Sequence, residues 1–500
     1  LLLLHANARQ TCTHIYAHRS SVAVFGGQVM SIPISGFMPL LYYRLDIFEK
    51  KQVLPPRTWD ELIKIAERFN GTDLDGDGLK NDFGICMWQA QMCPSIGLPL
   101  VAILASLVQT HGLSSGLYIE PYSGESVLQT VAWENALTVA ANLSTFAPPA
   151  PKYLSGTTDC SYMPLFGQGR CAMAIAGPNQ FKIDSIARRA TPPSVTSPAT
   201  NSSNSSNSSS NSSSSGGSGA SPVAAAFSVK GRIGAAIFPG SSEVLDWTAK
   251  KMVPCDATRC PHAVQYPGGL YVNAPPFAAM VGFAAFINKK FTPVEQLVTY
   301  NLISQAVRPD NSWALVAEPS HGGGPTRTEH LKPSNRRKWQ QYGYDAGDLD
   351  RFLTATTAAL ESQNIAMDIR SVGANNFTRI TYRAAVMLGG EQKSPAQVLY
   401  ETQNLYNVIL NASNRAELLR SYRASIGYTL PPVSNSRCSG CARHTTVLGA
   451  ALISSLVGAA LLAAGAVGSV WLLRRHRLRL LRRLRRILPP GPGRDTTLCV

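Results

Sequence analysis

The chain has 500 residues, of which 45% are hydrophobic and 15% charged, so it can bury the cores of two or three domains and is not a disordered protein. Its formal net charge is +16 at pH 7, and eight arginines between residues 474 and 486 are concentrated directly after an apolar run. Arginines in that position indicate the cytoplasmic side of a membrane segment. We therefore expect no nucleic-acid partner.

Residues 1–30 carry no pattern that predicts an element, apart from the start of a strand-like stretch. This stretch, VMSIPI at 29–34, is the first predicted strand. Thr58 and Glu61 then form a capping-box pattern directly after two prolines, which predicts the start of a helix. The apolar residues of this helix recur at helical spacing and should face a core: Trp59, Leu62, Ile63, Ala66 and Phe69.

The loop after this helix is rich in side-chain oxygen atoms. They come from Asp73, Asp75, Asp77, Asn81 and Asp82. Carboxylates at alternate positions, with Gly78 for a tight turn, suit a hard cation, so the loop predicts a structural Ca²⁺ site. The twelfth position is Gly84 and not the glutamate of an EF-hand, which leaves a solvated acidic turn as the alternative.

The remaining elements indicate an α/β protein. Helical spacing predicts a helix over 131–144 whose inward residues are Trp133, Leu137, Ala140 and Leu143. Residues 193–222 form a low-complexity Ser/Asn insert that cannot build a core. Strand patterns follow at 231–240 and 268–274, and mostly helical sequence comes after them. Short apolar strands alternating with capped helices favour an α/β fold with a largely parallel sheet.

Two short patterns imitate a hydrolase. Gly112-Leu-Ser114-Ser-Gly116 fits a nucleophile elbow, and His321-Gly-Gly-Gly324 fits an oxyanion loop. A nucleophile elbow needs a strand before it and a helix after it, whereas here an apolar helical run comes first and a strand-like LYIEP follows. The oxyanion loop should also precede the serine in the chain. We therefore expect no catalytic residues and no enzyme activity.

Sequons and cysteines indicate that the residues before 445 lie outside the cell. Asn-x-Ser/Thr sequons occur at Asn70, Asn142, Asn201, Asn204, Asn207, Asn211, Asn376 and Asn411. Proximity in sequence predicts four disulfides, Cys86–Cys93, Cys160–Cys171, Cys255–Cys260 and Cys438–Cys441, with Cys12 and Cys499 left over. Such local pairs are typical of an oxidising, extracellular environment. An outward-facing domain needs an export signal, so we expect the natural sequence to begin further upstream.

One membrane-spanning helix is predicted near the C-terminus. Residues 445–473 contain no charged residue over 29 positions, which at ~1.5 Å per residue exceeds a ~30 Å hydrocarbon core. A stalk at 431–444 precedes this span, and a basic cytoplasmic segment at 474–500 follows it. Small residues spaced four apart in the span are compatible with a homodimer through this helix. The predicted location is the plasma membrane, with one pass and an extracellular N-terminus.

Five pieces of sequence resemble the family 1 extracellular solute-binding proteins, the maltose-binding-like group with a type II periplasmic-binding fold. In the family's own order they are LYYRLDIFEKKQVLPPRTWDELIKIAERF (41–69), DLDGDGLKNDFG (73–84), FGQGRCAMAIAGPNQ (166–180), GRIGAAIFPG (231–240) and GGLYVNA (268–274). The resemblance implies two α/β lobes that close around a hinge on a small solute, often an oligosaccharide.

The resemblance also implies which residues contact the solute. They are Tyr42 and Tyr43, Gly177 and Asn179, and Gly269 and Tyr271, with Trp88 as a further aromatic candidate. Position 179 holds asparagine where the family usually has a stacking tryptophan. Far fewer residues precede the Tyr-Tyr pair than in the family, so we expect an ectodomain over 31–430 with an incomplete first lobe, of which residues 1–30 are a remnant.

The last residues of the chain carry a second resemblance. PPGPGRDTTLCV (489–500) is similar to the junction ahead of class III adenylate or guanylate cyclase domains. The leading hypothesis is therefore a receptor whose solute-binding ectodomain is coupled through one helix to a cytoplasmic cyclase outside this chain. Two alternatives stay open: a tethered substrate-binding protein that serves a transporter, and a surface scaffold that binds no solute.

Overall fold

The computed structural model describes residues 23–25, 28–87, 97–149, 163–186, 227–278, 282–412 and 414–430. The chain divides into two compact units, residues 1–430 and 431–500, and all described residues belong to the first. The low-complexity insert, the stalk, the predicted span at 445–473 and the basic segment lie outside these ranges. Within them, no helix combines the length and the apolar character needed to cross a bilayer.

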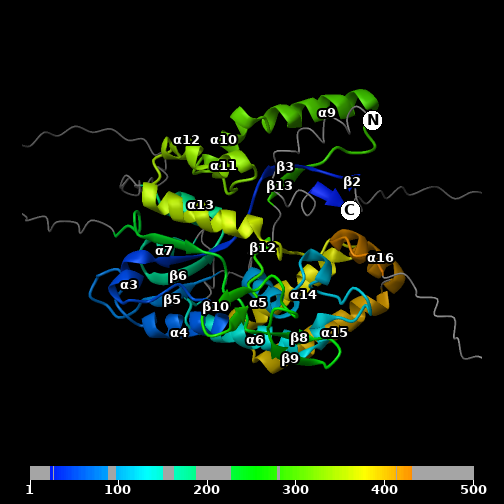
Figure 1. The fold of residues 1–500 in the computed structure, drawn as a ribbon, viewed down its shortest axis with the longest axis horizontal. Helices are drawn as coiled ribbons and strands as arrows, with labels where there is room; N and C mark the ends of the chain where they lie inside the picture. The colour runs from blue at the N-terminus through cyan, green and yellow to red at the C-terminus, as the bar shows by residue number, and fades with distance from the viewer. Residues whose placement is uncertain are drawn as a thin grey trace, which may run out of the picture. The chain divides into compact units, whose positions relative to one another are not determined.

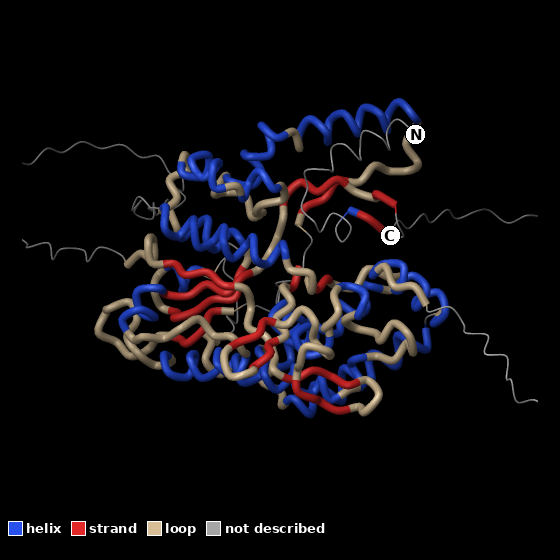
Figure 2. The backbone as a smooth tube through the Cα atoms, in the orientation of Figure 1, coloured by secondary structure: helices blue, strands red, loops and turns tan. Residues whose placement is uncertain are grey.

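A four-stranded sheet lies toward one end of the larger of two lobes (Figures 1 and 2). Its order is β5 (Phe83–Cys86), β6 (Cys171–Ala176), β4 (Leu40–Arg44) and β7 (Ile233–Ala236). β4 runs antiparallel to both of its neighbours, and only β5 and β6 are parallel. The prediction of a largely parallel sheet is therefore wrong. β5 and β6 are joined through helices and are parallel, whereas β4 meets β6 and β7 only after long excursions of the chain, so no helical crossover between neighbouring strands sets the direction of β4.

Helices cover both faces of this sheet. α13 (Ala346–Glu361) packs on β7, whereas α4 (Trp59–Phe69) packs on β5 and β6 from the other side (Figure 1). The other helices of the larger lobe are α3 (Leu45–Lys50), α5 (Leu98–Val108), α6 (Val131–Ser144), α7 (Pro164–Gly167), α8 (Pro178–Asp184), α14 (Ala374–Gly389), α15 (Pro395–Ala412) and α16 (Arg415–Ile426). Of these, α5 and α14 both contact α6, and α15 packs against α6 and α14.

The two helices predicted from apolar spacing are confirmed. α6 has the predicted bounds, and its inward residues are fully or almost fully buried. α4 begins after Thr58, whose hydroxyl accepts the backbone N–H of Glu61 at 3.2 Å, as an N-cap should. The second half of the capping box differs from the prediction, because Glu61 accepts the backbone N–H and the side chain of Arg57 instead.

The smaller lobe is built around two short strands and one helix. β3 (Ile32–Ser35) pairs antiparallel with β13 (Phe283–Ala285), and α9 (Pro293–Ala306) follows (Figure 1). Its buried cluster consists of Ile32, Tyr300 and Val307 among the described residues. β1 (Val24–Phe25) and β2 (Gln28–Val29) form a hairpin before β3. The chain passes from β3 in this lobe to β4 in the larger lobe through residues 36–39, which we call the crossover.

The remaining elements are short and connect these parts. α10 (Pro309–Ala317), α11 (Thr328–Leu331) and α12 (Arg336–Gln340) lead from α9 to α13. Two antiparallel hairpins, β8 (Glu243–Asp246) with β9 (Lys251–Pro254) and β10 (Val264–Tyr266) with β11 (Leu270–Val272), follow β7. β12 (Phe277–Ala278) pairs parallel with β14 (Ala366–Met367). Single 3-10 turns lie at Leu113–Ser115, Val127–Gln129 and Pro333–Asn335.

Two disulfides occur among the described residues. Cys255–Cys260 is confirmed as predicted. Cys86 pairs with Cys171, which overturns the predicted Cys86–Cys93 and Cys160–Cys171 bonds. Proximity in sequence gave the wrong partner because β5 and β6 are hydrogen-bonded neighbours in the sheet although 85 residues separate the two cysteines. The predicted Cys438–Cys441 bond lies outside the described residues.

Arg44, at the end of β4, is a buried cation that joins three parts of the larger lobe. Its guanidinium binds both carboxylate oxygens of Asp46 at 2.8 Å and donates to the backbone oxygens of Leu74 (3.1 Å) and Gly169 (2.8 Å). It also lies 4.4 Å from the ring centre of Phe227. One side chain therefore holds together β4, the loop at 73–82 (the acidic loop) and the turn before β6.

We predict that Arg44→Met lowers the free energy of unfolding by about 3 kcal/mol, because two buried carbonyls and a carboxylate lose their donors. Urea unfolding followed by tryptophan fluorescence measures the change. Arg232→Met is the matched control, since Arg232 also lies near Asp46 (3.8 Å) and Phe227 but its side chain is 47% exposed. We expect less than about 1 kcal/mol for the control, and equal losses in the two variants would contradict the prediction.

Candidate functional site

Two of the predicted solute contacts meet at the centre of the sheet. Tyr42 lies on β4, is fully buried, and donates its hydroxyl to the backbone oxygen of Gly177 at 3.2 Å. Burial, with a smaller contribution from the charge of Asp184, raises the pKa of Tyr42 well above its ordinary value, so the hydroxyl stays protonated and can donate. Tyr43 is also buried and packs on Phe48. Tyr42 therefore supports the backbone at Gly177, whereas Tyr43 belongs to the core beside α3.

The stretch Gly177–Asn179 starts α8 and is covered by other parts of the same chain. A side chain could not be added to Gly177, because a Cβ there would lie 2.4 Å from the ring of Phe37. Pro178 lies close to Gly324, whose added Cβ would be 2.9 Å from the proline ring. Asn179 is only 2% exposed. The residues at the position of the family's ligand contact are therefore enclosed by the crossover and by the segment around Gly324.

The other predicted contacts lie apart from these. Gly269 is exposed in the turn between β10 and β11, where its φ of 78° requires glycine. Tyr271 on β11 packs beside the Cys255–Cys260 disulfide, in a hydrophobic cluster separate from the one that contains Tyr42. Trp88 lies outside the described residues. The structure thus brings Tyr42 and Gly177 together and leaves Tyr271 in a different environment.

Lys182 on α8 is a polar residue of this region that the sequence analysis missed. Its side chain is fully buried, and its ammonium donates to the backbone oxygens of Val316 (3.1 Å), His321 (2.5 Å) and Gly323 (2.8 Å). Burial lowers its pKa to about 8, against the opposing influence of Glu318. Lysines in sequence are almost always surface residues, so no local pattern marks this one.

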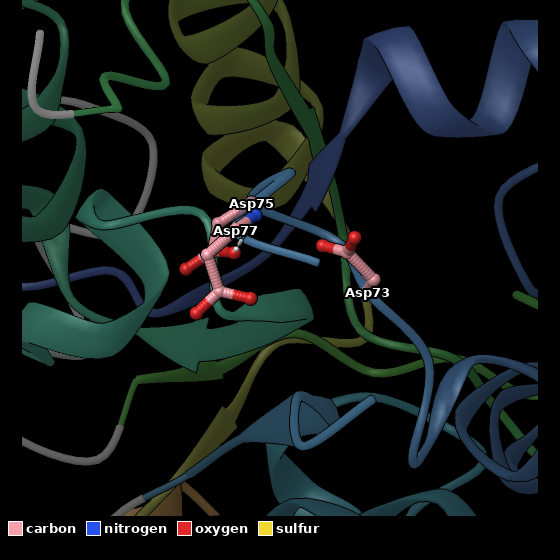
Figure 3. A group of neighbouring side chains, drawn as sticks. All are labelled: Asp73, Asp75 and Asp77. Carbon is pink, nitrogen blue, oxygen red and sulfur yellow. Dashed lines mark hydrogen bonds between the residues drawn. The ribbon is translucent and has the colours of Figure 1, made fainter. Parts of the chain in front are cut away.

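The acidic loop places three carboxylates together. Oxygen atoms of Asp73, Asp75 and Asp77 lie within 4.8 Å of one another (Figure 3). The other two predicted ligands are engaged by Arg170 instead: Asp82 binds its Nε at 2.9 Å, and the Asn81 side-chain oxygen accepts from its guanidinium at 3.0 Å. Arg170 also lies 3.9 Å from Asp75, so one fixed positive charge already offsets part of the acidic cluster.

Comparisons with known proteins agree with this architecture. Residues 14–254 match the family described as bacterial extracellular solute-binding protein. Maltose-bound MalE3 of T. maritima is a similar solved structure, with 17% identity over 81% of this chain and 79% of that one and a TM-score of 0.52. The chain has the fold of the extracellular solute-binding proteins. A chitin oligosaccharide binding protein is similar at 12% identity, over 82% and 78% of the two chains, with a TM-score of 0.50. No curated protein sequence matches the chain.

In this solute-binding fold, one buried pair resembles part of a catalytic site. Ser312 Oγ lies 2.9 Å from His330 Nε2. The other ring nitrogen accepts the backbone N–H groups of Thr326 and Arg327 at 3.3 Å, so the proton must be on Nε2 and points at the serine. Burial, then the charge of Arg327, lowers the pKa of His330 to about 3. A histidine in this tautomer cannot take the serine proton, so the pair is structural.

The hydrolase-like patterns also lack the context that catalysis needs. Ser114 lies in a 3-10 turn that ends at Gly116, and no helix follows it directly. His321 contributes its backbone oxygen to Lys182. Neither segment has the strand-turn-helix geometry of a nucleophile elbow.

We propose that the acidic loop binds Ca²⁺ as a structural ion and predict that Ca²⁺ raises the melting temperature of the chain by a few degrees relative to EDTA, because an ion that binds only the folded state stabilises it. Differential scanning calorimetry measures the shift. Asp73→Asn combined with Asp77→Asn should abolish it, whereas Asp60→Asn, which removes an exposed carboxylate on α4, should not. Identical melting in Ca²⁺ and EDTA would identify the loop as a solvated acidic turn.

Proposed function

We propose that this chain is a solute-binding module that acts outside the cell and takes a carbohydrate or polyol as its ligand. The observation that carries the proposal is the fold, which the chain shares with a maltose-bound protein and with a chitin oligosaccharide binding protein. The match of residues 14–254 to the bacterial extracellular solute-binding family supports it. Binding by lobe closure requires no catalytic group, and none of the described residues forms a catalytic arrangement that we recognise.

The residues at the site suggest how such a ligand is held. Asn179 replaces the aromatic platform of the family with an amide that can both donate and accept hydrogen bonds. We therefore expect recognition of hydroxyl groups by hydrogen bonding, with less stacking on the sugar ring than in the family. Tyr42 acts indirectly, because its hydroxyl is committed to the backbone of Gly177.

We predict that the full chain in detergent binds at least one saccharide of a panel that includes maltose and chitin oligosaccharides, measured by isothermal titration calorimetry. For the saccharide that binds best, Asn179→Ala should raise the Kd about ten-fold, because a buried hydrogen-bond partner is lost. Asn404→Ala, at an exposed position of α15, is the control and should leave the Kd unchanged. If the folded chain binds no saccharide of the panel at millimolar concentration, the scaffold alternative replaces this proposal.

We also propose that the module is the ectodomain of a single-pass receptor, coupled to a cytoplasmic nucleotide cyclase. Support comes from the uncharged run at 445–473, the arginines that follow it, and the resemblance of residues 489–500 to a cyclase junction. Sequencing the natural transcript through both ends tests the coupling. We predict an export signal upstream and a cyclase domain after Val500. A stop codon directly after Val500 would instead favour a tethered binding protein that serves a transporter.

A further inference from the structure

Three segments that are far apart in sequence meet beside the start of α8. They are the crossover (36–39), the stretch Gly177–Asn179, and the segment 321–324, which we call the Gly-rich loop. Gly36 and Gly324 exchange backbone hydrogen bonds, from Gly36 N–H at 2.9 Å and from Gly324 N–H at 2.6 Å. A Cβ on Gly323 would lie 2.2 Å from Ser35 Oγ. At Gly323 the Gly-rich loop is thus packed against the end of β3 without space for a side chain, and at Gly324 it is hydrogen-bonded to the crossover.

This packing encloses the proposed solute contacts. Phe37 of the crossover covers Gly177, and Gly324 of the Gly-rich loop lies against Pro178. Asn179 is 2% exposed, and Tyr42, which donates to the backbone oxygen of Gly177, is fully buried. A solute can therefore reach Gly177–Asn179 only after the Gly-rich loop and Phe37 have moved away from α8.

Lys182 is the side chain that fastens the Gly-rich loop to α8. Its three ammonium hydrogens match three backbone oxygens, one at the end of α10 (Val316) and two in the Gly-rich loop (His321 and Gly323). Hydrogen bonds from a charged donor in a water-free site are stronger than neutral ones. Lifting the loop breaks two of the three bonds, so water must replace the lost acceptors or the ammonium keeps only its bond to Val316.

We propose that Lys182 is a latch that holds the Gly-rich loop over α8 and thereby controls the access of solute to Gly177–Asn179. The latch rests on the proposed function, because it assumes that this stretch is the solute site. If Lys182 acts in this way, the enclosed state predominates without solute. The apparent affinity for solute then equals the intrinsic affinity multiplied by the fraction of molecules in which the loop is open.

The test measures access without any solute. Asn179→Cys places a thiol at the enclosed position of the full chain, and the rate of its reaction with a small methanethiosulfonate reagent reports how often the loop lifts. The chain with Asn179 intact gives the background from other cysteines. Adding Lys182→Met, which keeps the aliphatic stem but removes the donors, should accelerate labelling at least about ten-fold. Lys230→Met is the matched control, because Lys230 also donates to a backbone oxygen (Gly343) but on the surface, and it should have no effect.

A second variant opens the loop without touching Lys182. Gly323→Ala should also accelerate labelling, because its Cβ cannot fit beside Ser35. Faster labelling in Gly323→Ala with unchanged labelling in Lys182→Met would overturn the latch, because the loop would then lift at a rate that does not depend on Lys182, and unchanged labelling in both variants would overturn it as well. Hydrogen exchange of the β4 and β6 amides separates lifting of the loop from unfolding, and equal acceleration of core and loop exchange would also overturn it. Because no solute is used, the two failures can be told apart: a chain that binds no saccharide refutes the proposed function and with it the control of solute access, whereas faster labelling in that chain would still show that Lys182 fastens the Gly-rich loop to α8.

Discussion

Strand β4 is hydrogen-bonded on both sides, and every one of its five residues is buried. A strand in that position has no freedom to shift, because a slip of one residue would exchange its two faces. Its side chains therefore act as fixed points for segments that lack regular structure. Tyr42 fixes the backbone of Gly177, and Arg44 fixes the acidic loop at Leu74 and the turn at Gly169. The enclosed site and the acidic loop both depend on this one strand.

Buried polar groups elsewhere in the larger lobe bind mainly to backbone atoms. Asn273 and Asn364 donate to the backbone oxygen of Gln109, and the Gln109 amide donates back to the backbone at Asn364 and Ile365. This network joins the end of α5 to the segments that carry β11 and β14. Lys182 follows the same rule, since all its acceptors are carbonyls. Burying such groups costs little free energy of folding when every hydrogen bond is made, and much more when one is missing. They therefore favour a single arrangement of the connecting segments.

Local features of the sequence predicted local structure well. The bounds of α6 and the start of α4 follow from apolar spacing and from the cap at Thr58, which depend only on residues a few positions apart. The direction of the strands and the partner of Cys86 depend on which distant segments become neighbours, and neither could be read from spacing. The resemblance to solute-binding proteins predicted solute contacts at Tyr42 and Gly177, which the structure places side by side. It could not reveal that Phe37 covers them, nor that Lys182 is buried, because both follow from packing across more than a hundred residues.

The complete burial of Lys182 has a chemical consequence for the chain as a whole. An amine-reactive reagent modifies lysines that water can reach, and the ammonium of Lys182 is sealed from water on every side. Covalent modification at this position would thus occur only in molecules that had opened, and would trap them there, because an acylated nitrogen carries one hydrogen in place of three. An acylating reagent that reaches this nitrogen during such an opening would therefore convert a transient state of the protein into a permanent one.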